Sequence, residues 1–178
     1  ADSVRWFILS DSPPEKDDQW SDAGVVSSSI FLQKVWNLNQ SILNKTESEV
    51  DKDKQKSFEN KIDLSVYKID NAINNFQFNV AIAQFYEIYR FFSDAMKLGI
   101  NNKTLVSNMI KIMKLMIPFT PHIAYECLTN LNCEEFKEIF FEPYLPNYKI
   151  GIMHLAAGIW KDGKDMRINK EIKIEIKT

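Results

Sequence analysis

This 178-residue chain contains two histidines and two cysteines, and one of the histidines stands close to a glutamate late in the sequence. His122 and Glu126 are four residues apart, so on a helix they face each other and could share a proton or a metal ion. A zinc site needs three or four protein ligands, and one histidine with one carboxylate falls short. We therefore expect no metal site, and we interpret His122 and Glu126 as a structural pair joined by a local hydrogen bond.

The two cysteines, Cys127 and Cys133, are too few and too close together to predict a disulfide framework. Free cysteines are usually buried, so we expect unreactive thiols in a reducing cytoplasm. The N-terminus has no basic segment followed by an apolar run and a cleavage site, and no apolar run approaches the ~20 residues of a membrane span. The sequence predicts a cytoplasmic protein without membrane contact.

Motifs that bind nucleotides or activate a nucleophile are absent from the sequence. With five glycines in total, it contains neither a GxGxxG nor a GxxxxGK[ST] loop to cradle a phosphate. His122 or His154 could be combined on paper with a serine and an aspartate, but no GxSxG turn supports such a triad. We expect that this chain does not catalyse a reaction by itself.

The charge composition constrains any contact with nucleic acid. A formal net charge of −2 argues against binding through bulk positive charge, so an RNA contact has to come from a local patch. One candidate is a basic strip: at 100° per residue Lys103, Lys111 and Lys114 share one face of a predicted helix. Arg5 is a further candidate. The alternative is a solvated lysine face without a partner.

Helical periodicity dominates the chain and predicts an all-α fold of four or five antiparallel helices packed as a bundle. A short helix with Asp2 as its cap should end before Pro13 and Pro14, and a long helix should restart at Ser21 or Asp22. The apolar spacing then predicts helices over residues 23–43, 57–75, 76–92 and 103–117 and from residue 121 onward. The charged stretch 44–56 is interpreted as a solvated connection or a frayed helix end.

Several residues have predicted structural roles at helix faces and ends. Trp36 lies on the apolar arc of the first long helix, whereas Lys34 falls outside it. Pro118 should stop one helix, and Thr120 should cap the next, with Pro121 at its first position. The aromatic residues between 85 and 92 could form a base-stacking platform, but their helical spacing favours core packing.

The predicted organisation has three parts. Residues 1–21 form a connector, residues 22–131 form the bundle, and residues 132–178 form a divergent, poorly defined tail. Within the tail, isoleucine alternates with charged residues at the end of the chain, which is typical of a β-strand and predicts one within residues 167–177.

Six phrases of the sequence together resemble one family. In order they are ADSVR, PPEKD, WSDAGV, FLQKVWNL, FNVAIA and PFTPHIAYE. This series is similar to leucyl-tRNA synthetases of the bacterial or organellar type, just downstream of their KMSKS loop, and the resemblance fades beyond Leu131. The family usually has arginine where this chain has Ile30 and Lys34; lysine cannot reproduce the guanidinium fork.

The resemblance implies a fragment with a defined role. It would be the anticodon-binding helical domain, which holds tRNA(Leu) by shape and phosphates rather than by anticodon bases, with Lys34 as an RNA contact. The HIGH and KMSKS motifs of the catalytic domain are missing, so ATP and magnesium would bind elsewhere in the same polypeptide and this fragment would need no cofactor. The implied partners are tRNA(Leu) and that catalytic domain, with a monomeric protein and no DNA.

Two alternatives remain open. The same domain could come from an isoleucine, valine or methionine enzyme, although the PPEKD, WSDAGV and FLQKVW series argues against it. The chain could also be a helical protein-interaction module without an RNA role, which its slight acidity would allow.

Overall fold

The computed structural model describes residues 1–11, 19–46 and 50–133, and every regular element in these ranges is a helix. In chain order the helices are α1 (Asp2–Asp11), α2 (Asp22–Leu43), α3 (Lys52–Asn74), α4 (Phe78–Ala95), α5 (Asn102–Met116) and α6 (Pro121–Asn130). The predicted all-α bundle is confirmed. The strand predicted within residues 167–177 lies outside the described residues.

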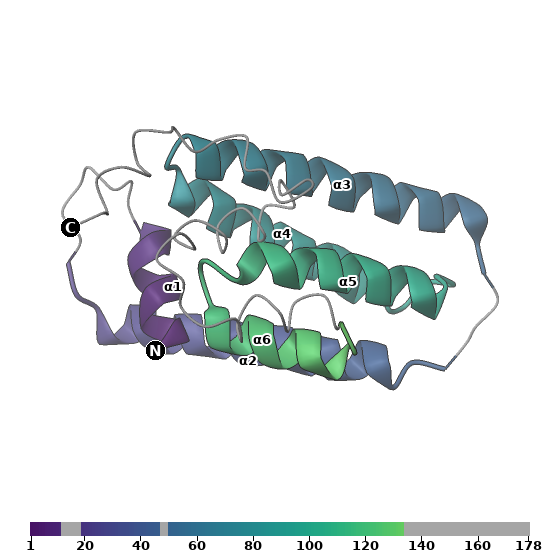
Figure 1. Ribbon diagram of the computed structural model, residues 1–178, viewed down its shortest axis with the longest axis horizontal. Coiled ribbons are helices and arrows are strands. Elements are labelled where there is room, and N and C mark those ends of the chain that lie inside the picture. The colour runs from purple at the N-terminus through teal and green to yellow at the C-terminus, as the bar shows by residue number, and fades with distance from the viewer. Residues whose placement is uncertain (12–18, 47–49, 134–178) are drawn as a thin grey trace, which may run out of the picture.

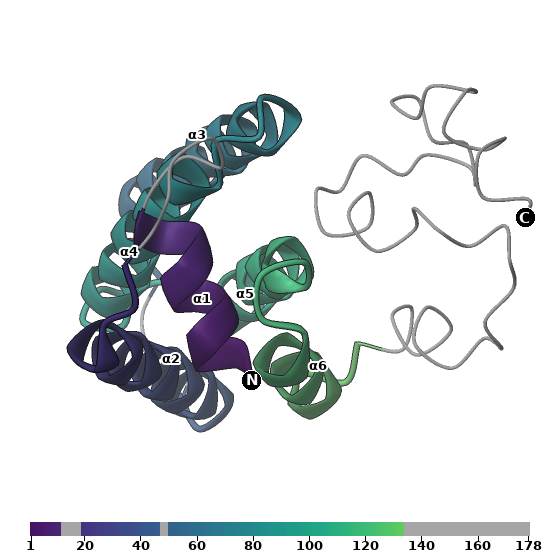
Figure 2. The same ribbon diagram turned by 90° about the vertical axis from the view of Figure 1, so that its left-hand side faces the viewer.

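Five of the helices run roughly along the long axis of the molecule, and α1 lies across one end of them (Figure 1). Viewed from that end, α1 crosses from α4 toward α6 (Figure 2). It packs against α2, α4 and α6. Packing therefore does not stop at the predicted boundary of the connector at residue 21, because α1 closes the end of the bundle.

Local side-chain caps set where three of the six described helices begin. The Ser21 hydroxyl accepts from the N–H of Gly24, and the Asn101 side chain accepts from the N–H of Lys103. For α2 the sequence left Ser21 and Asp22 open as the start, and the structure selects Ser21 as the cap. Asp51 caps α3 by accepting from the N–H of Lys54, so this helix starts at Lys52 rather than at residue 57.

The connection between α2 and α3 is more than a solvated linker. The Lys45 ammonium donates to the carbonyls of Met96 and Leu98, at 3.2 and 3.4 Å, just past the end of α4. The N–H of Asp51 donates to the carbonyl of Gly99 at 2.8 Å. A cation at the carbonyls that follow a helix is favourable, so Lys45 ties this connection to the one between α4 and α5.

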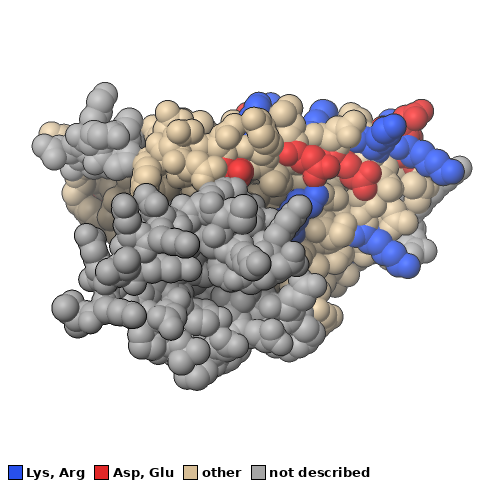
Figure 3. Space-filling model, turned by 45° about the horizontal axis from the view of Figure 1, so that its top comes forward, with Lys and Arg blue, Asp and Glu red and all other residues tan. Residues whose placement is uncertain are grey.

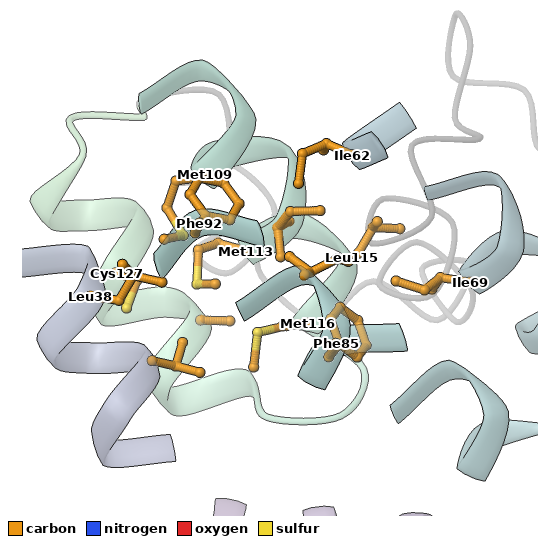
Figure 4. Packing of buried hydrophobic residues seen from close by; sticks show 14 of the residues in the cluster. Leu38, Ile62, Ile69, Phe85, Phe92, Met109, Met113, Leu115, Met116 and Cys127 are labelled. Atoms are coloured by element: carbon orange, nitrogen blue, oxygen red, sulfur yellow. The ribbon is translucent and has the colours of Figure 1, made fainter. Parts of the chain in front are cut away.

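The core is one continuous cluster to which all six helices contribute. Phe85 and Phe92 point into it together with methionines of α5 (Figure 4). Their burial confirms the interpretation of these two aromatics as core, although Tyr86 and Tyr89 on the same helix remain partly accessible. Leu115 of α5 is buried as well, because α5 contacts α2, α3 and α6.

Both cysteines are buried and free. Burial, and secondarily the nearby carboxylate of Glu126, raises the pKa of the Cys127 thiol to about 12. Among the described helices none is long and apolar enough to cross a membrane.

The Cys127 thiol predicts a loss of stability at alkaline pH. The unfolded thiol ionises near pH 9.0 and the folded one near pH 12, so the unfolded state gains charge first and stability falls as pH rises between these values. We expect Cys127→Ala, followed by urea denaturation from pH 8 to pH 11, to lose stability less steeply than the wild type. Equal slopes would mean that this thiol ionises as readily in the folded state as in the unfolded one.

Candidate nucleic-acid interface

Lys34 projects from the middle of α2 beside a groove between α2 and α4. The groove has a volume of about 310 Å³ and is lined by Lys34, Asn37, Leu38, Ser41, Tyr89, Ser93 and Met96. Lys34 is exposed, as its position outside the apolar arc predicted. Within the part of the chain that the structure describes, no carboxylate pairs with it. A cation beside hydroxyl and amide groups is the chemistry that binds a phosphate and its sugar.

The three lysines of the predicted basic strip have different surroundings. Lys111 donates to Asp63 of α3 at 2.6 Å in an ion pair, so much of its charge is locally balanced. Lys114 is half-buried and interacts within the fold. Lys103 is exposed, without an ion-pair partner among the described residues. On the part of the surface that is coloured in Figure 3, basic and acidic side chains lie next to one another.

Arg5 is exposed, and its guanidinium lies against the turn that follows α5. Its Nε donates to the carbonyl of Phe119 at 3.1 Å, and its Nη2 donates to that of Pro118 at 2.7 Å. These carbonyls belong to the turn between α5 and α6. The structure thus gives Arg5 a role in joining α1 to this turn, while its predicted contact with RNA stays a prediction.

Asp2 reaches the same turn from the first position of α1. Its Oδ2 accepts from the N–H of Ile123 at 2.8 Å, and its Oδ1 lies 2.7 Å from Nδ1 of His122. Asp2 therefore caps α6 rather than its own helix, whose first N–H groups bond to the carbonyl of Ala1. The prediction that Asp2 caps the first helix was wrong, because its side chain turns toward a helix far away in the sequence.

The same contacts correct two further predictions. Thr120 does occupy the cap position of α6 with Pro121 following it, but its side chain makes no capping bond; the buried hydroxyl donates back to the carbonyl of Met116 at 3.4 Å. His122 bonds to Asp2, whereas Glu126 is exposed on the next turn. Asp2 supplies both the capping bond that was expected from Thr120 and the hydrogen bond to His122 that was expected from Glu126. Because Asp2 belongs to another helix, residue spacing within α6 could not reveal it.

Comparison with known proteins decides the family. The profile described as "Anticodon-binding domain of tRNA ligase" matches residues 55–177, more than half of the chain. The chain belongs to this family. The match continues through the tail, so the family resemblance does not end at Leu131 as the sequence suggested.

Curated relatives of this anticodon-binding domain are leucine–tRNA ligases. One from Prochlorococcus marinus strain AS9601 is 36% identical over 130 residues, which cover 71% of this chain and 15% of the relative. One from Granulibacter bethesdensis is 31% identical over 72% of this chain and 16% of the relative. One from Prochlorococcus marinus strain MIT 9215 is 28% identical over 99% of this chain and 20% of its own length. The chain thus corresponds to a minor segment of these enzymes.

A solved structure shares the fold. It is the leucyl-tRNA synthetase of Agrobacterium radiobacter K84 in a ternary complex with tRNA and LeuAMS. The TM-score is 0.64 at 20% identity, over 75% of this chain and 18% of that one. The likeness shows that the helical arrangement is that of a segment of a leucyl-tRNA synthetase.

The WSDAGV segment, residues 20–25, packs α1 against α2. The Trp20 ring meets Phe7 edge-on, with centroids 5.8 Å apart, and its N–H donates to Asp22. Gly24 lies against Phe7 so closely that an added Cβ would come within 2.4 Å of the ring. Sequence reasoning missed the requirement for Gly24, and a glycine inside a strongly helical pattern was the available signal.

Trp36 and Ile30 show how the first long helix meets solvent. Trp36 is half-buried and packs against the core cluster, so it has the expected structural role but lies at the edge of the core. Ile30, where the family usually carries arginine, is 53% exposed. The replacement therefore removes a charge from the surface without adding to the core.

Among the described residues no three metal-ligating side chains come together.

Proposed function

We propose that this chain is the tRNA-binding domain of a leucine–tRNA ligase and that it holds tRNA(Leu) through the groove between α2 and α4. The observation that carries the groove assignment is an exposed lysine, Lys34, without a carboxylate partner among the described residues, beside a hollow lined with hydroxyl and amide groups. Leucine–tRNA ligases are the relatives that align along the chain. This combination favours the leucine enzyme over the isoleucine, valine and methionine alternatives.

The groove suits backbone recognition rather than base reading. The rings of Phe85 and Phe92 are buried and cannot stack on bases, so Tyr89, which is partly accessible, is the one aromatic residue in the described lining of the groove. Lys34 and the Ser93 hydroxyl suit phosphate and sugar oxygens. With a net charge of −2 the chain has no bulk attraction for RNA, so a few placed contacts must position it. ATP and magnesium belong, in this proposal, to a catalytic part of a longer, monomeric, cytoplasmic polypeptide.

Removing Lys34 tests the groove. We expect Lys34→Ala to leave the unfolding midpoint unchanged and to weaken tRNA(Leu) binding about tenfold, as expected for one charge-assisted hydrogen bond of about 1.5 kcal/mol. The slope of log affinity against log salt should fall by roughly the contribution of one phosphate contact. Fluorescence titration across salt measures both quantities, in the full-length protein if this chain alone binds weakly.

A matched control is Lys52→Ala, which removes the same charge from an exposed position at the start of α3, outside the groove. It should change neither the affinity nor the salt slope by as much. If Lys34→Ala and Lys52→Ala behave alike, the groove is not the RNA contact, and Lys103 becomes the first alternative.

A further inference from the structure

Three side chains on one face of α1 hold the turn between α5 and α6. Asp2, Arg5 and Trp6 follow the i, i+3, i+4 spacing that places residues on the same side of a helix. All three meet residues 118–123: Asp2 at the N–H of Ile123, Arg5 at the carbonyls of Pro118 and Phe119, and Trp6 edge-on to the ring of Phe119. We call these three residues the α1 clamp.

The α1 clamp supplies hydrogen-bond partners that the turn between α5 and α6 lacks. Carbonyls at the end of one helix and N–H groups at the start of the next have no partners within their helices. The guanidinium of Arg5 donates to the carbonyls of Pro118 and Phe119, just past the end of α5, and the carboxylate of Asp2 accepts from an N–H in the first turn of α6. Each charge also has the sign that the neighbouring helix dipole favours. The α1 clamp therefore makes hydrogen bonds at both ends of the turn.

Two of the three residues of the α1 clamp are largely buried. Trp6 is 0% exposed and the Asp2 side chain is 11% exposed, whereas Arg5 is exposed. Beside the clamp, Gly24 and Phe7 bring α1 and α2 into close contact. Since α1 is held on two sides, rotating it would break charge-assisted hydrogen bonds and open the core together.

We infer that Asp2 and Arg5 are positioning residues that fix the angle between the bundle and whatever precedes α1 in the longer protein. This inference rests on the proposed function, in which the bundle holds tRNA while the reaction takes place elsewhere. The 22 residues of α2 span about 33 Å at 1.5 Å per residue, so a tilt of about 2° at α1 displaces the far end by about 1 Å. A misplacement of about 1 Å can cost roughly a hundredfold in rate.

The test uses the full-length protein and separates positioning from binding and from stability. For Asp2→Ala with Arg5→Ala we expect the kcat of tRNA leucylation to fall at least about tenfold. The KM for tRNA should stay within about threefold, because the groove that binds it is intact. Leucine-dependent ATP–pyrophosphate exchange, which needs no tRNA, should stay within about twofold. A role in stability alone would lower the melting temperature while leaving kcat per titrated active site unchanged.

Conservative single variants still test the inference if the double variant does not fold. Asp2→Asn retains an acceptor for the N–H of Ile123 and should restore most of the kcat lost in Asp2→Ala, because asparagine caps helices as well as aspartate does. Arg5→Lys keeps the charge but cannot fork onto two carbonyls, so its kcat should fall at least about threefold. Arg90→Ala, an exposed arginine that pairs with Glu87 on its own helix, should behave as wild type.

The outcomes distinguish this inference from the proposed function. A wild-type protein that does not leucylate tRNA overturns both. An active wild type whose Arg5→Lys and Asp2→Ala variants keep normal kcat overturns the positioning role alone and leaves the α1 clamp a purely structural device.

Discussion

Trp6→Ala is expected to destabilise the 178-residue chain by roughly 3–5 kcal/mol, the cost of deleting a fully buried aromatic side chain and leaving its cavity. Trp6 is 0% exposed and stands where α1, α2, α4 and the α5–α6 turn meet. Its ring stacks on Phe31 with centroids 5.2 Å apart and contacts Phe85 at 5.7 Å.

Two control variants assign the cause of this loss. Tyr86→Phe removes only the hydroxyl that accepts the indole N–H of Trp6 at 3.1 Å, and should cost about 1 kcal/mol. Trp36→Ala removes an equally large ring from the edge of the core and should cost less than Trp6→Ala, because Trp36 is only half-buried. Urea denaturation at equal slope measures all three. If Trp36→Ala costs as much as Trp6→Ala, α1 does not close the core as described.

The contrast between the two tryptophans shows how far periodicity reaches. Both stand in apolar patterns, and the 100° rule correctly placed Trp36 on the inner arc and Lys34 outside it. The rule gives a direction around the helix axis but not how many neighbours lie there. Trp6 is enclosed by aromatic rings from α2 and α4 and from the α5–α6 turn, whereas Trp36 lies where the neighbouring helices leave it partly open.

Helix starts were predictable for only some of the local caps. Ser21, one of two candidates for the start of α2, acts on an N–H three residues away. Asp51 acts over the same distance, yet the charged stretch around it was interpreted as a connection. Asp2 acts on an N–H that is 121 residues away, and no local pattern identifies such a partner. The same limit applies to Lys111, whose position on a helix face was predicted but whose pairing with Asp63 of α3 was not.

Two of the phrases that carried the family resemblance contact each other. ADSVR supplies Asp2 and Arg5, and PFTPH supplies the turn that they bind. WSDAGV supplies the cap of α2 and the glycine beneath Phe7. These stretches are recognisable because their roles require particular residue types. The candidate RNA groove is formed mostly by ordinary polar residues of two helices, and only its lysine could be singled out from the sequence.

Gly24→Ala should destabilise the chain, although alanine is the better helix former by about 1 kcal/mol. Gly24 lies within α2, so helix propensity alone would predict a gain. Its added Cβ would stand 2.4 Å from Cε2 and 2.7 Å from Cδ2 of Phe7. Either the ring leaves its place or α1 shifts, and overpacking of this kind costs roughly 1–3 kcal/mol. We expect a net loss of up to about 2 kcal/mol.

A double-mutant cycle tests this expectation, because the effect of Gly24→Ala on stability should change sign when the Phe7 ring is removed. In a Phe7→Ala background the ring is gone, so Gly24→Ala should become neutral or stabilising by up to about 1 kcal/mol. Denaturation midpoints of the four proteins give the coupling energy directly. If Gly24→Ala has the same effect in both backgrounds, the close approach of α1 and α2 at this glycine is not what the WSDAGV phrase encodes.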